Sequence, residues 1–134
     1  MTIETFIGLL VIAGVGWYTT HKLTSLRDLR AKRGAARTDF LAAVTDDALS
    51  APTLAIYVHQ NLTVNIHAID TFRRFVPTKD QAAYDQAAKE YYDACEPHRN
   101  LGLLASLAVD LSPNAVSDRQ AIIEAIKKLR TFAN

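Results

Sequence analysis

The chain has 134 residues, a formal net charge of +1 and a single cysteine, Cys95. This length is typical of one domain, and one cysteine excludes a disulfide within the chain. Six of the 15 basic residues fall between Lys22 and Arg37, so much of the positive charge belongs to one short segment. A nucleic-acid-binding protein more usually carries its positive charge on the folded domain, so we expect no nucleic-acid partner.

The first expected element is a transmembrane anchor over residues 1–20. Between Ile3 and Tyr18 the only charged residue is Glu4. A helix of about 17 residues lies at the lower edge of the length that spans a bilayer. The residues expected at the membrane interface are two aromatic and three basic ones, Trp17, Tyr18, Lys22, Arg27 and Arg30. A cleaved signal peptide and a buried core helix are the alternatives for this segment.

The second expected segment is a basic helical stem over residues 21–37. Its basic residues all follow the apolar run, so the positive-inside rule predicts a single-pass protein with its N-terminus outside and its C-terminal domain cytoplasmic. The same residues would contact anionic headgroups, which makes membrane lipid an expected partner. The alternative is that they only set the topology and then form a solvated helix face.

Residues 38–134 are expected to form a soluble helical domain. The anchor helix should run on through Leu23, Leu26 and Leu29 towards Gly34, and a further turn or more of helix around Phe40 should end near residues 50–52. The clearest signal is an apolar helix face formed at steps of three and four residues, which predicts a helix of about six turns ending before Pro77. Its members are Leu54, Val58, Leu62, Ile66, Ile69, Phe72 and Val76.

Three more helices follow in the prediction. Thr78 and Gln81 have the spacing of a capping box, as do Ser117 and Gln120, and each pair is expected to begin a helix. A short apolar helix is expected over residues 101–111. No segment alternates as a strand would, so the fold class is all-α, with an N-terminal transmembrane helix and a four- to five-helix bundle.

The sequence offers little support for a catalytic or metal site. His67 and Asp70 share a helix face, but a metal ion needs further ligands and no residue is spaced to supply them. The carboxylates of residues 80–96 fall on varied faces of one helix, with no nucleophile beside them. Cys95 is interpreted as a small core residue. We expect no catalytic residue, no cofactor and no metal.

Arg73 and Arg74 lie between Phe72 and Phe75 at the end of the long predicted helix. An arginine drawn towards the core needs a carboxylate partner, and Glu90 or Asp93 on the next helix is the candidate. The alternative is that the two arginines complement the dipole at the C-terminus of their own helix. Both interpretations are structural.

The residues Phe72-Arg73-Arg74-Phe75-Val76-Pro77 and Tyr84-Asp85-Gln86-Ala87-Ala88-Lys89-Glu90-Tyr91 carry a resemblance. The pattern is similar to that of small uncharacterised bacterial proteins that begin with one apolar helix and a basic stem and end in a helix like residues 122–133. The resemblance implies a bacterial inner-membrane protein and carries no activity.

Three functional hypotheses follow. The first is a membrane-tethered, non-enzymatic helical module that binds a protein partner or self-associates at the cytoplasmic face. The second is a membrane-perturbing protein, similar to small phage proteins or toxins, that depends on residues 3–18. The third is an enzyme with an unrecognised site, which would need carboxylates converging with His59 or His67 in a deep pocket.

Overall fold

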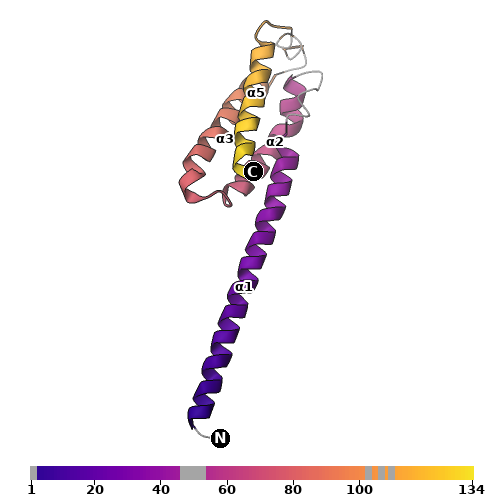
Figure 1. Ribbon diagram of the computed structural model, residues 1–134. Coiled ribbons are helices and arrows are strands. Elements are labelled where there is room, and N and C mark those ends of the chain that lie inside the picture. Colours follow the sequence, from indigo (N-terminus) through magenta and orange to yellow (C-terminus); the bar gives the residue numbers. More distant parts are fainter. Residues whose placement is uncertain (1–2, 46–53, 102–103, 106–107, 109–110) are drawn as a thin grey trace. The chain divides into compact units, whose positions relative to one another are not determined.

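The computed structural model describes residues 3–45, 54–101, 104–105, 108 and 111–134. Its α-helices are α1 (Ile3–Ala43), α2 (Leu54–Arg73), α3 (Gln81–Cys95) and α5 (Ala115–Arg130) (Figure 1). The 3₁₀ turns Thr78–Asp80 and Glu96–His98 flank α3, and a third, Thr131–Ala133, follows α5. The residues so described contain no strand, which confirms the all-α prediction. The chain divides into an N-terminal unit, Met1–Ala35, and a bundle unit, Ala36–Asn134.

Helix α1 is longer than the sequence pattern predicts. One uninterrupted helix runs from Ile3 to Ala43, where a break near Gly34 was expected. A single glycine weakens an exposed helix by only about 1 kcal/mol, and no proline lies nearby to stop the helix. The predicted end near residues 50–52 lies outside the described residues.

The predicted transmembrane anchor is wrong. Over the part of the chain that the structure describes, no helix combines the length and the apolar character that crossing a bilayer requires. The uncharged run is bounded by Glu4 and Lys22 and includes threonines and His21, so it falls short of about 20 predominantly apolar residues. The predicted single-pass location in the inner membrane, with the N-terminus outside and the domain cytoplasmic, is therefore also wrong.

The core of the bundle unit is built around aromatic residues from three helices. The rings of Phe40 on α1 and Phe72 on α2 stack with centroids 4.7 Å apart, and Tyr84 on α3 packs against both. Phe132 meets the Tyr84 ring edge-on at 5.3 Å. The apolar face expected on the long helix, which is α2, is largely buried, as are Ile122, Ile126 and Leu129 on α5. The helical periodicities therefore describe real core faces, and the helical bundle is confirmed.

Hydrogen bonds join the C-terminal end of α1 to α5 and to the turn after it. The Arg130 guanidinium donates at 2.8 Å to the carbonyl oxygens of both Leu41 and Val44. Arg37 donates to the carbonyl of Ala133. The last carbonyls of a helix have no partner inside it, so Arg130 supplies the bonds that the helix end lacks.

The starts of the later helices differ from the predicted capping boxes. Thr78 begins a 3₁₀ turn and α3 begins at Gln81, whose side-chain amide donates to the Val76 carbonyl at 3.2 Å. Helix α5 begins at Ala115, two residues before the predicted Ser117, whose hydroxyl donates to the Asn114 carbonyl. The predicted helix over residues 101–111 lies mostly outside the described residues.

Candidate interaction surface

The exposed surface of α1 carries large apolar side chains. Among the side chains of α1 that the structure describes, nine large apolar ones are exposed, and two, Trp17 and Ile12, are each 72% exposed. Seven of the nine, which we call the apolar stripe, are Val11, Ile12, Val15, Tyr18, Leu23, Leu26 and Leu29. A surface helix normally turns such residues towards a core, whereas these lie in solvent.

The apolar stripe occupies one side of α1. At 100° per residue, its seven members fall within a sector of about 140°. Trp17 lies outside the sector and stacks on His21, with ring centroids 5.6 Å apart and planes 7° from parallel. The width of the stripe is that of a helix face made for packing against another element.

Polar and basic groups lie within the stripe and beside it. A hollow of about 550 Å³ is lined by Thr20, Leu23, Thr24, Leu26, Arg27 and Arg30. Lys22 lies within the stripe, with its ammonium nitrogen 5.8 Å from the centre of the Tyr18 ring. Hydroxyl groups of Thr19, Thr20 and Thr24 are turned back onto carbonyls of the preceding turn. Lys22 and Arg30 therefore fall within the sector of the apolar stripe, and Arg27 lies beside it.

The five residues assigned to a membrane interface all lie on this part of α1. Tyr18 is a member of the stripe, and Arg27 and Arg30 line the hollow. Trp17 is on another side of the helix. The interface assignment depended on a spanning helix, which the structure does not contain among its described residues.

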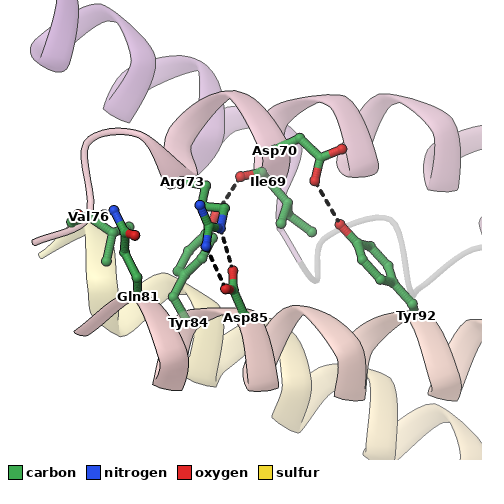
Figure 2. Close-up of polar contacts among 8 residues, drawn as sticks. All are labelled: Ile69, Asp70, Arg73, Val76, Gln81, Tyr84, Asp85 and Tyr92. Carbon is green, nitrogen blue, oxygen red and sulfur yellow. Dashed lines mark hydrogen bonds and ion pairs between the residues drawn. The ribbon is translucent and has the colours of Figure 1, made fainter. Parts of the chain in front are cut away.

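Arg73 is paired, but not with the predicted carboxylates. Its guanidinium binds Asp85 on α3 through two hydrogen bonds, of 2.6 and 2.7 Å (Figure 2). The hydrogen bond to Arg73 is the main reason that the pKa of Asp85 lies below its ordinary value, and the same bond raises the pKa of Arg73. Both side chains are nearly half exposed, so this pair clamps α2 to α3 at the surface.

The other predicted members of the ion pair have separate partners. Glu90 binds Lys128 on α5 at 2.7 Å, and this contact, with Gln86, lowers the pKa of Glu90. Asp93 binds Lys89 one turn earlier on α3 at 2.6 Å. Arg74 donates to the Thr71 carbonyl and lies over the Phe75 ring. The prediction that Arg73 or Arg74 binds Glu90 or Asp93 is therefore wrong.

Two further bonds join α2 and α3 beside the Arg73–Asp85 pair. The buried Tyr84 hydroxyl donates to the Ile69 carbonyl at 2.8 Å (Figure 2). Burial is the main cause of a raised Tyr84 pKa. Tyr92 lies 3.5 Å from a carboxylate oxygen of Asp70, and burial raises the pKa of Tyr92 to about 12.

A buried polar cluster in the bundle escaped the sequence analysis. The Asn65 amide donates to the Tyr91 hydroxyl at 2.6 Å and reaches the Tyr57 hydroxyl at 3.4 Å, while the two hydroxyls are 3.3 Å apart. Tyr57, Asn65 and Tyr91 are each about 1% exposed or less. Asn65 falls between the apolar positions Leu62 and Ile69 of α2, and this polar residue near the apolar face is the only signal that could have indicated the cluster.

Two titratable groups near the end of α3 are also buried. Burial raises the pKa of the Cys95 thiol to about 12, which makes it unreactive at neutral pH. His98 is 3% exposed and its Nε2 is 3.7 Å from Asp118. Neither ring nitrogen of His98 has a hydrogen-bond partner among the described residues.

The histidines considered for metal binding or catalysis do not converge. His59, His67 and Asp70 are all exposed on α2. His67 shares a hollow of about 280 Å³ with Asp39, Phe40 and residues of α2. Within the described ranges, no three His, Cys, Asp or Glu side chains are grouped as a metal site would need.

Comparison of the chain with models of protein families, with curated proteins and with solved structures gives no match. The resemblance to small bacterial proteins with one apolar helix stays a prediction.

Proposed function

We propose that this protein is a helical interaction module that binds another protein chain, either a partner or a second copy, through the apolar stripe of α1. The observation that carries the proposal is the concentration of seven exposed apolar side chains on one side of a continuous helix. The membrane tether of the first hypothesis is not part of the proposal.

Exposed apolar surface of this extent favours association. Single exposed apolar residues are ordinary, but contiguous patches on monomeric proteins are small, and larger ones mark interaction sites. Burial of an exposed Leu or Val side chain is worth about 1.5–3 kcal/mol. Leu23, at 67% exposure, and Ile12, at 72%, have most of that free energy still to gain. Helix-in-groove or helix–helix pairing is the mode that such a stripe fits.

The test compares two variants of the full chain. Leu26→Asp places a negative charge in the stripe, whereas Ala31→Asp places the same charge on another side of α1. We expect the first variant to lose self-association in sedimentation, or a specific co-purifying protein, and the second to keep it. The proposal would be contradicted if the wild-type chain is monomeric and every protein that co-purifies with it also co-purifies with the stripe variant.

The two other hypotheses stay predictions. The membrane-perturbing protein predicts that expression alone depolarises cells and that deletion of residues 3–18 abolishes the effect. The enzyme hypothesis needs carboxylates converging with His59 or His67, and the described hollow at His67 contains Asp39 as its one acidic lining residue.

A further inference from the structure

The apolar stripe has an internal symmetry that points to its partner. Three pairs of stripe residues have numbers that add to 41, namely Ile12 with Leu29, Val15 with Leu26, and Tyr18 with Leu23. Two antiparallel copies of α1, related by a two-fold axis between residues 20 and 21, would place Ile12 opposite Leu29 and Val15 opposite Leu26 of the other copy. Tyr18 and Leu23 would lie at the same level along the axis, on the two flanks of this seam. A two-fold interface requires this self-complementarity.

We propose that the apolar stripe binds the same stripe of a second copy of this chain, antiparallel, with residue numbers of opposed positions adding to 41. The inference rests on the proposed function and specifies its partner. Heptad positions support the register, because Ile12, Val15, Leu26 and Leu29 fall at a and d positions of one continuous repeat. The pairing engages residues 11–30 only, all within the N-terminal unit.

The charges favour antiparallel over parallel pairing. Lys22 occupies the same heptad seam as Val15 and Leu29, so a parallel dimer would place Lys22 against Lys22 of the second copy. In the antiparallel register Lys22 lies opposite Thr19 of the second copy. The Thr19 hydroxyl already donates to carbonyls of its own helix, so its oxygen is oriented to accept from the ammonium. The two-fold axis makes two such Lys22–Thr19 layers, next to one another at the centre of the pairing, and polar layers of this kind set register in paired helices.

The register is tested with full-length Val15→Cys and Leu26→Cys variants and a short bifunctional thiol reagent. We expect a crosslinked dimer when the two variants are mixed and none from either variant alone. In the proposed register position 15 of one copy lies opposite position 26 of the other, whereas the two copies of position 15 are about 16 Å apart along the helix axis. Wild type, in which Cys95 is buried, and Ala31→Cys are the controls that should not crosslink. Crosslinking of Val15→Cys with itself would overturn the antiparallel register.

Sedimentation equilibrium provides a second readout that needs no cysteine. Leu26→Asp should raise the dimer dissociation constant by at least about tenfold, because each dimer loses two buried leucines, while Ala31→Asp should leave it within about twofold. A wild-type chain that stays monomeric overturns the inference, whether or not the monomer binds vesicles of anionic phospholipid. If such a monomer still binds another protein through the stripe, the proposed function stands. If the stripe variants bind every partner as the wild type does, the inference and the proposed function are both overturned.

Discussion

At the scale of single residues, the bundle is distinguished by a polar cluster inside its core. Asn65 donates to the hydroxyl groups of Tyr91 and Tyr57, and all three residues are buried. A buried amide that lost its acceptor would pay the full cost of desolvation. The cluster therefore specifies how α2 and α3 align, since only one register brings Asn65 to Tyr91.

Tyr91→Phe should destabilise the protein by about 1–3 kcal/mol, because the Asn65 amide loses its shortest hydrogen bond in a buried site. Tyr92→Phe is the matched control, since Tyr92 is only partly buried and its hydroxyl lies 3.5 Å from the exposed Asp70, and should cost less than about 1 kcal/mol. Urea denaturation measures both. Equal losses for the two variants would show that the buried cluster has no special role.

At the scale of the elements, contacts between helix ends decide how the bundle closes. Arg130 on α5 binds the carbonyls of Leu41 and Val44 at the end of α1. Arg73 and Asp85 bind α2 to α3, and Lys128 and Glu90 bind α5 to α3. Charged side chains thus join α1 to α5, α2 to α3, and α3 to α5.

Arg130→Met should lower the free energy of unfolding by about 1.5–3 kcal/mol, the range for hydrogen bonds to a charged group. The substitution keeps the apolar stem of the side chain and removes the donors to the end of α1. Lys127→Met, at an exposed position of the same helix, should change stability by no more than about 0.5 kcal/mol. Thermal denaturation followed by circular dichroism distinguishes the two outcomes, and an unchanged Arg130→Met protein would contradict the capping role.

The Arg73–Asp85 pair should make stability depend on acid. Arg73 lowers the pKa of Asp85 in the folded chain, so the stabilisation is complete above the unfolded value of about 3.9 and is lost as pH falls through the lower folded pKa. Asp85→Asn should therefore be less stable than wild type at pH 7, with a difference that shrinks below about pH 4. Melting curves from pH 7 to pH 3 provide the measurement.

Asp93→Asn is the control for this titration, because Asp93 binds Lys89 within α3 and joins no second helix. Its destabilisation at pH 7 should be smaller than that of Asp85→Asn. A difference between Asp85→Asn and wild type that stays constant down to pH 3 would argue against the pair as a source of acid sensitivity.

At the scale of the whole molecule, the chain has two units with different sources of stability. Phe40 and Val44 near the end of α1 are fully buried in the bundle unit. The apolar stripe of the N-terminal unit remains exposed. Isolated helices gain little from propensity alone, so the bundle should carry the cooperative folding transition and the N-terminal unit should gain its stability from a partner.

A fragment of residues 36–134 should therefore fold cooperatively and remain monomeric. Within it, Phe40→Ala should cost about 3–5 kcal/mol, the range for a large aromatic side chain removed from a core. Circular dichroism and sedimentation measure the two properties. A fragment that unfolds without a cooperative transition would show that the bundle needs residues 3–35.

The sequence by itself determined the helices of the bundle, because burial at steps of three and four residues is a local property that the chain displays directly. It also located the apolar and basic segments of α1. It failed at the span, where an uncharged run too short to cross a bilayer resembled an anchor, and at helix starts, where capping spacings were satisfied by other bonds.

Only the tertiary structure decided the partners of the charged side chains. Asp85, Glu90 and Asp93 all lie on α3, and the register of α2 against α3 brings Asp85 to Arg73. The cluster of Tyr57, Asn65 and Tyr91 likewise exists because residues 26 and 34 positions apart meet in the core. Periodicity specifies which face of a helix is buried, but only packing between helices specifies which groups meet there.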